Sequence, residues 1–190
     1  MAATTIFFAA AVEDDRTALA RGLRRRDPDL LDQLVERYQY RLFRYLVYLT
    51  GSRETAEDLF QETWIRVLDR GYQYDGRSRF ETWLFAIARH LVLDSHKRKI
   101  PHSLDVLTEV EFAAADPSPA DLLSEREVQA SLHGSLEKLP AVFREVLLLR
   151  FQEELGLEEI AAVLDVPVST VKSRLYRGLE AMRGRLEGKL

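Results

Sequence analysis

Apolar residues recur at spacings of three and four along most of the chain, which is the period of amphipathic helices. Asp27, Pro28 and Asp29 resemble a helix start, because a capping acid is followed by proline in the first turn. Gly51 and Gly71 are typical helix ends. The pattern predicts helices over 16–26, 28–50, 55–70, 78–99, 121–139, 142–151 and 157–164, and a last one that starts near 167–169.

The helical pattern fades between residues 101 and 120, where prolines and acids predominate. Such a stretch usually separates domains or has a task of its own. We therefore predict an all-α fold, in which two small helical domains are joined by a flexible acidic linker. The predicted divisions are an N-terminal extension over 1–14, a first domain over 15–100, the linker over 101–120 and a second domain over 121–190.

The chain has 190 residues, no cysteine and a net charge of −4, so disulfides and thiolate metal sites are excluded. Charge is unevenly distributed. Segments 77–99 and 167–185 each carry a net charge of +4, whereas 103–127 carries −6. Two basic segments in an acidic chain indicate a nucleic-acid partner. No apolar run approaches the roughly 20 residues that span a bilayer, so we expect no membrane insertion and a cytoplasmic location.

A helix-turn-helix is the sharpest motif, formed by a short helix over 157–164, a turn at Asp165-Val166 and a second helix. Apolar residues would hold the second helix inward at Val171, Leu175, Leu179, Met182 and Leu186. Its opposite face suits DNA, because arginine and lysine can reach guanine, and hydroxyls can reach phosphates or bases. The predicted DNA contacts are Ser169, Thr170, Lys172, Ser173, Arg174, Tyr176 and Arg177. A solvated face of a helical bundle is the alternative.

Two further surfaces are less specific. On the helix from Thr55, a polar face opposite the apolar stripe comprises Asp58, Gln61, Glu62 and Ile65. A solvated face would account for the charged residues, whereas a protein partner would explain the apolar Ile65, and the pattern favours neither over the other. The helix from 78 to 99 interleaves aromatic and basic residues, as single-strand binders do. For Phe80 and Leu84 we favour a core position instead. For the basic residues we favour nucleic acid.

Enzyme functions find little support in the sequence. The four histidines do not have the spacing of metal ligands. The glutamates of the pairs 153–154 and 158–159 are adjacent, so their side chains point apart on a helix. The sequence contains neither a glycine-rich phosphate loop nor a nucleophile elbow. We therefore expect no catalytic residue, no metal and no cofactor.

Taken together, these motifs resemble those of bacterial RNA polymerase sigma factors of the extracytoplasmic-function (ECF) type within the sigma-70 family. TAEDLFQETWIRVL (55–68) is similar to conserved region 2.2, and GRSRFETWLFAIARHLVLDSHKRK (76–99) to regions 2.3 and 2.4. SLEKLPAVFREVLLLRFQEELGLEEIAAVLDVPVSTVKSRLYRGLEAMR (135–183) is similar to region 4. The order and separation of the motifs make the resemblance specific.

The resemblance implies a role for each surface. The Asp58 face matches the one that docks on the clamp helices of the largest polymerase subunit, and the second domain would contact the flap region. The residues that match minus-ten recognition and melting are Arg77, Arg79, Trp83, Arg89, His90, Lys97 and Arg98; His90 stands where family members often carry asparagine. The helix-turn-helix face matches minus-thirty-five recognition. The linker matches the segment that enters the polymerase channels, and an anti-sigma factor is a further implied partner.

Two hypotheses from different classes follow. One is a sigma factor, which binds core polymerase and promoter DNA and catalyses nothing itself. The other is a stand-alone helix-turn-helix regulator with an N-terminal sensing or dimerisation domain. The Asp58 face and the aromatic–basic helix favour the sigma factor, because a regulator of duplex DNA needs neither. A hydrolytic enzyme would need a nucleophile and base that the sequence lacks.

Overall fold

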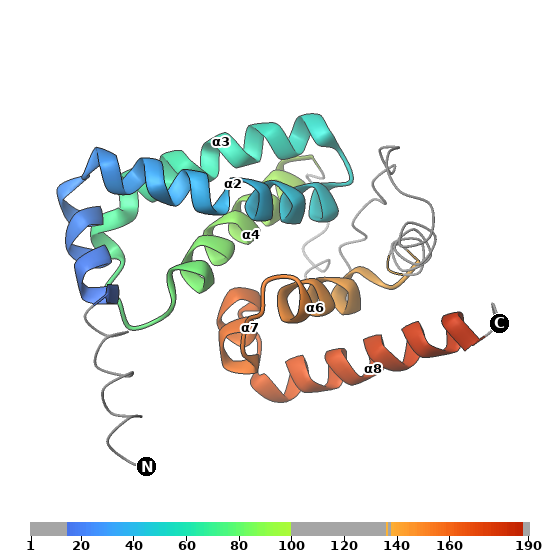
Figure 1. Cartoon of the computed structure of the whole chain (residues 1–190). Coiled ribbons are helices and arrows are strands. Elements are labelled where there is room, and N and C mark those ends of the chain that lie inside the picture. Colours follow the sequence, from blue (N-terminus) through green and yellow to red (C-terminus); the bar gives the residue numbers. More distant parts are fainter. Residues whose placement is uncertain (1–14, 100–135, 137, 188–190) are drawn as a thin grey trace, which may run out of the picture.

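The computed structural model describes residues 15–99, 136 and 138–187, and every regular element among them is helical. The elements are an N-terminal helix over residues 15–25, α2 (Pro28–Thr50), α3 (Arg53–Arg70), the short 3₁₀ turn η1 (Gly71–Gln73), α4 (Phe80–Lys99), α6 (Ala141–Phe151), α7 (Leu157–Leu164) and α8 (Val168–Glu187). Figure 1 shows two groups, with α2, α3 and α4 in one and α6, α7 and α8 in the other. The all-α prediction is confirmed for the described residues. The predicted linker over 101–120 lies outside them, as do residues 1–14.

Both ends of α2 follow the sequence prediction. The Asp27 carboxylate accepts hydrogen bonds from the backbone N–H groups of Asp29 and Leu30, and Pro28 occupies the first turn. Gly51 ends the helix with a φ of 63° and donates its N–H to Val47 O.

The start of α3 differs from the prediction at Thr55. The helix begins at Arg53, because Ser52 is the cap and its hydroxyl accepts a hydrogen bond from Thr55 N at 3.3 Å. Leu68 continues the same apolar period but is 41% exposed. The remaining stripe is buried or half-buried, with Ala56, Thr63 and Val67 fully enclosed.

Helix α4 begins at Phe80, two residues later than the predicted start at residue 78. Phe80 and Leu84 are core residues, as predicted. In the second group, Pro140 precedes α6 and Asp165 ends α7 in the left-handed conformation. A three-residue turn then leads into α8, which confirms the predicted helix-turn-helix. The helix predicted over 121–139 lies largely outside the described residues.

The buried side chains of the two groups form one continuous cluster. In the first group, Leu42, Leu46 and Leu84 are fully enclosed, and Tyr45 packs edge-on against Phe85 with ring centroids 5.0 Å apart. In the second group, the enclosed side chains include Leu149 and Ile160. Because burial of one such side chain contributes about 1.5–3 kcal/mol, contact between the groups stabilises their observed arrangement.

Candidate nucleic-acid and polymerase interface

Helix α3 presents the predicted polar face to solvent. Asp58 and Gln61 are exposed, and Glu62 is partly exposed and pairs with Arg66 at 2.9 Å. Ile65 is 49% exposed, as its position within a polar face had predicted. Leu68 adds a second exposed apolar side chain one turn further on. A solvent-exposed apolar strip flanked by carboxylates suits a protein partner better than water.

The segment between α3 and α4 is tied down by an aromatic cluster. Tyr74 is buried, and its hydroxyl donates to Ser78 O at 2.8 Å. The Tyr74 ring lies 5.8 Å from that of Phe80 and 5.5 Å from that of Trp83. Burial raises the pKa of Tyr74 to about 12, so its hydroxyl remains a hydrogen-bond donor at neutral pH. Trp83 is half-buried at the edge of the cluster, so part of its ring remains accessible.

Four of the residues predicted at the minus-ten element are exposed. Arg77 lies in the loop before α4, with its guanidinium Nε 3.3 Å from Asp75 Oδ2. His90 is exposed on α4, with Nδ1 2.8 Å from Ala86 O. Lys97 and Arg98 are exposed in the last turn of the same helix. These side chains could reach phosphates without any rearrangement.

Arg79 and Arg89 lie elsewhere, against the second group. Arg89 Nε is 3.0 Å from Glu145 Oε1 of α6, and the Arg89 side chain is only 14% exposed. Tyr45 donates to the same carboxylate oxygen at 2.9 Å. Arg79 lies 3.2 Å from Glu81 and 3.8 Å from Glu159 of α7. In this arrangement, a carboxylate of the second group holds Arg89, whereas Arg79 is held mainly by Glu81 of its own group and lies within ion-pair distance of Glu159.

Glu81 links α2 to the start of α4, because its carboxylate interacts with both the Tyr38 hydroxyl and Arg79. Burial alone would raise the pKa of its carboxyl, but a backbone hydrogen bond, Arg79 and the Tyr38 hydroxyl together hold that pKa below its usual value. Glu81 is thus charged at neutral pH and holds Arg79 beside the start of α4. Thr82 extends the contact by donating to Glu159 Oε1 at 3.2 Å.

A further charged contact was not predicted from the sequence. Arg41 Nε donates to Glu153 Oε2 at 2.8 Å, and Arg44 Nη2 donates to Glu153 Oε1 at 3.3 Å. The Glu153 side chain is 2% exposed, so it is enclosed between the groups. The i, i+3 spacing of the two arginines was the only available signal. It gave no indication of a glutamate 112 residues from Arg41.

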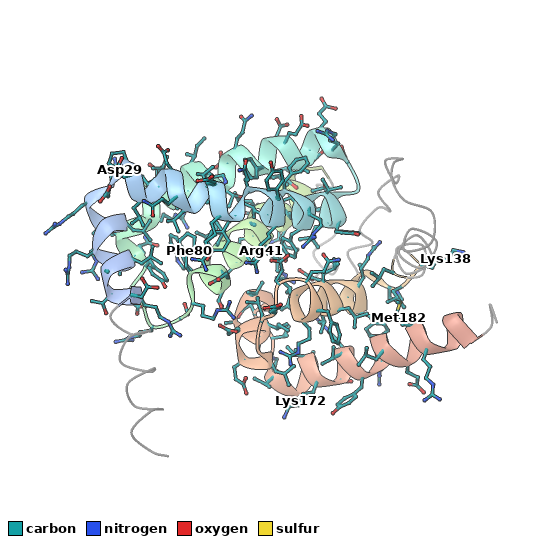
Figure 2. All side chains as sticks on the ribbon, in the orientation of Figure 1. Asp29, Arg41, Phe80, Lys138, Lys172 and Met182 are labelled. Atoms are coloured by element: carbon teal, nitrogen blue, oxygen red, sulfur yellow. The ribbon has the colours of Figure 1, made fainter. Side chains whose placement is uncertain are left out.

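The rotation of α8 agrees with the sequence prediction over its first two turns. Val171 is fully buried, whereas Lys172, Ser173, Tyr176 and Arg177 are exposed, with Tyr176 at 71%. Arg174 and Thr170 are half-exposed and Ser169 is exposed. Figure 2 shows Lys172 on the outer side of α8, away from α6. The predicted reading face is therefore accessible and forms a single surface.

The predicted buried stripe fails further along α8, at Leu179. Leu179 is 42% exposed, and Leu175 and Met182 are half-buried. The contact with α6 is made instead by Gly178, where an added β-carbon would lie 3.2 Å from Leu147 Cδ1. This close approach holds α8 against α6 through a residue that has no side chain, so a hydrophobic pattern could not reveal it. Leu186 has no described side chain.

The described residues contain no group of three or more histidine, aspartate or glutamate side chains arranged to hold a metal ion. Among the helices that the structure describes, none is both long and apolar enough to cross a membrane.

Comparison with known families gives two matches along the chain. Residues 34–100 match the family Sigma-70 region 2, and residues 129–182 match Sigma-70, region 4. The first match contains α3 and α4 with the candidate polymerase and minus-ten surfaces. The second contains the helix-turn-helix.

Curated relatives agree with these matches. The chain is 33% identical to ECF RNA polymerase sigma factor SigW of Bacillus subtilis, over 84% of this chain and 90% of SigW. It is 37% identical to ECF RNA polymerase sigma factor SigE of Mycolicibacterium smegmatis, over 82% of this chain and 61% of SigE. Among solved structures, CnrH in complex with the cytosolic domain of CnrY superposes with a TM-score of 0.67 at 20% identity, over 92% of this chain and 99% of CnrH.

Two helical domains, a helix-turn-helix and matches to sigma regions 2 and 4 define a sigma-70-type transcription initiation factor. Within that class, the chain belongs to the ECF RNA polymerase sigma factors, as the resemblance of its motifs had implied. A member of this family directs core RNA polymerase to promoters, so this function is supported over that of a stand-alone regulator.

Proposed function

We propose that the exposed face of α3 is the surface by which this sigma factor binds core RNA polymerase. The observation that carries the proposal is Ile65, an exposed apolar side chain among Asp58, Gln61 and Glu62 on the side of α3 that faces away from the core. The clamp helices of the largest polymerase subunit would cover this strip. The second domain would contact the flap region.

Promoter contacts divide between the two domains. Arg77, Trp83, His90, Lys97 and Arg98 would hold the opened minus-ten element, with phosphates on the basic groups and an unstacked base against the indole. Arg79 and Arg89 would join them after the second domain has moved away. The exposed face of α8 would read the minus-thirty-five element in the major groove. The predicted contacts there are Ser169, Thr170, Lys172, Ser173, Arg174, Tyr176 and Arg177.

Binding to both elements requires the two groups to separate. The minus-thirty-five and minus-ten elements, by their positions, are centred about 25 base pairs apart, which corresponds to roughly 85 Å of duplex at 3.4 Å per base pair. A compact chain of 190 residues has a radius of gyration of about 16 Å and so is far shorter than this span. The contacts of Glu145, Glu153 and Glu159 would therefore break when the sigma factor joins polymerase and promoter.

The remaining partner is an anti-sigma factor, which would hold the chain until it is released. Support comes from similar folds, among them the sigma factor RpoE in complex with the anti-sigma factor NepR from Bartonella quintana. The chain would act in the cytoplasm as a polymerase subunit, without chemistry or a cofactor of its own.

Binding to core polymerase tests the docking face directly. In Asp58→Arg, the charge of an exposed carboxylate is reversed, so affinity for purified core should fall at least tenfold while helicity is unchanged. Glu36→Arg is the control that makes the same charge change, since Glu36 is also exposed but lies on α2. The docking assignment is wrong if the two variants bind core equally well. Absence of any complex between wild-type protein and core would contradict the sigma-factor function itself.

A further inference from the structure

Four exposed arginines lie at the end of the N-terminal helix, at positions that the sigma-factor assignment does not use. They are Arg21, Arg24, Arg25 and Arg26, named here the arginine cluster. Ala20 and Leu23 bury the opposite face of the helix. The cluster therefore places four positive charges within six residues on the surface of a chain whose net charge is −4.

Each member of the cluster lacks an ion-pair partner within the described part of the chain. Other exposed arginines differ in this respect, since Arg53 pairs with Glu57 at 2.9 Å and Arg77 with Asp75 at 3.3 Å. The nearby Asp27 carboxylate is already an acceptor for the first turn of α2. Like charges held this close repel one another unless an anion binds them.

Arg26 also adopts a backbone conformation that favours glycine. Its φ is 54°, and it ends the helix by donating its N–H to Leu23 O at 3.1 Å, while Asp27 N donates to Gly22 O at 3.1 Å. This hydrogen-bond pattern usually carries glycine at the left-handed position, because a β-carbon is strained there. Within the described chain, no contact of the Arg26 side chain offsets this strain, which suggests a role for its guanidinium outside the chain.

The helix that carries the cluster packs against the loop that precedes α4, and the arginines lie on its outer side. An added β-carbon at Gly71 would lie 3.2 Å from Leu23 O, and one at Gly76 would lie 3.1 Å from Arg16 O. The helix thus runs along this loop, with its arginine end beside Gly71 (Figure 1). The exposed Tyr72 follows at that end, and Arg77 lies further along the same loop.

We propose that the arginine cluster binds backbone phosphates of the promoter strand adjoining the minus-ten element, independently of base sequence. Guanidinium groups suit this task, because they contact phosphate oxygens with two parallel hydrogen bonds. The packing of this helix along the loop that carries Arg77 favours DNA over an acidic protein surface. The inference rests on the proposed function of that loop and extends its DNA surface along the N-terminal helix.

Arg26→Gly provides a sharp test, since glycine is the residue best suited to a φ of 54° and the fold should be retained or stabilised. The assay measures the affinity of the holoenzyme for a promoter selected from a library randomised in both elements, at several salt concentrations. We expect affinity to fall about fivefold to tenfold at 0.1 M salt and the salt dependence to weaken by about one unit of slope. The double variant Arg24→Gln, Arg25→Gln should lower the slope of the salt dependence by about two units and leave the base preference unchanged.

Arg53→Gln is the control that matches the charge change at another exposed arginine, and it should keep the wild-type slope. The inference is overturned if Arg26→Gly and the double variant keep wild-type affinity and slope. It is also overturned if they lower affinity for core polymerase instead, because the cluster would then bind protein. If wild-type holoenzyme selects no promoter from the library, the proposed function fails before the cluster is tested.

Discussion

At the residue scale, Gly76 determines the path of the loop before α4. Its φ of 76° lies in the left-handed region, and Arg16 O closes the space beside its α-carbon at 3.1 Å from an added β-carbon. A side chain at this position would be strained by backbone conformation and by contact at once. Tyr74 and Arg77 flank this glycine, so its conformation positions both a buried hydroxyl and an exposed guanidinium.

Gly76→Ala should therefore destabilise the protein by about 1–2 kcal/mol, the cost of a left-handed residue with a β-carbon. Gly184→Ala is the matched control. Gly184 lies in α8 with nothing within 4 Å of an added β-carbon, so alanine there should stabilise by about 0.5–1 kcal/mol. Urea unfolding measures both changes. A Gly76→Ala protein as stable as wild type would contradict this account of the loop.

At the scale of the element, α8 is oriented by its packing on α6 and α7. Val171 is buried, and Gly178 brings the two helix backbones close beside Leu147. Because both contacts lie on one side, Lys172, Ser173, Tyr176 and Arg177 share the other side. Thr170 lies in the first turn of the helix, where its hydroxyl suits a phosphate.

Arg177→Ala and Thr170→Ala should have different effects on the minus-thirty-five element. Loss of a base-reading arginine should cost about 1–3 kcal/mol and relax preference at one or two positions, whereas loss of a phosphate contact should weaken all sequences alike. Transcription from a library randomised in both elements measures this difference. Relaxed preference only at the minus-ten element in Arg177→Ala would refute the assigned reading face.

At the scale of the whole molecule, charged contacts between the groups hold the chain closed. The Glu145 carboxylate accepts hydrogen bonds from Arg89 and Tyr45. The Glu153 carboxylate forms ion pairs with Arg41 and Arg44. These carboxylates bind arginine side chains that would otherwise be available to bind phosphate. Since promoter binding demands separation of the groups, the strength of these contacts should govern how readily the free protein opens.

Glu153→Gln should shift the free protein toward open arrangements, because an amide keeps the size of the side chain but loses both ion pairs. Small-angle X-ray scattering should show a larger radius of gyration than wild type. Glu154→Gln removes the same charge at an exposed neighbouring side chain that has no ion pair in the described part of the chain, and should leave the radius unchanged. Equal radii for Glu153→Gln and wild type would show that Glu153 does not hold the groups together.

Several features were predictable because they depend on near neighbours in the chain. Asp27 and Gly51 bound α2 through hydrogen bonds that span two to four residues, and the turn at Asp165 follows from the same local rules. The period of apolar residues is enough to place Ile65 and Lys172 on exposed faces, where both side chains lie. The all-α fold and the helix-turn-helix follow from such patterns, whereas the family was indicated by the resemblance of whole motifs to those of sigma factors.

Other features depend on which distant surface covers a side chain. Leu68 and Leu179 continue the apolar periods of their helices yet are 41% and 42% exposed. Arg89 was predicted on a DNA surface, but it pairs with a glutamate 56 residues away. A periodic pattern shows which face of a helix is apolar, but it cannot show which charges from another domain meet that helix. The sequence alone therefore determined the helices and their exposed faces, whereas only tertiary packing decided that glutamates of the second group would cover the arginines of the first.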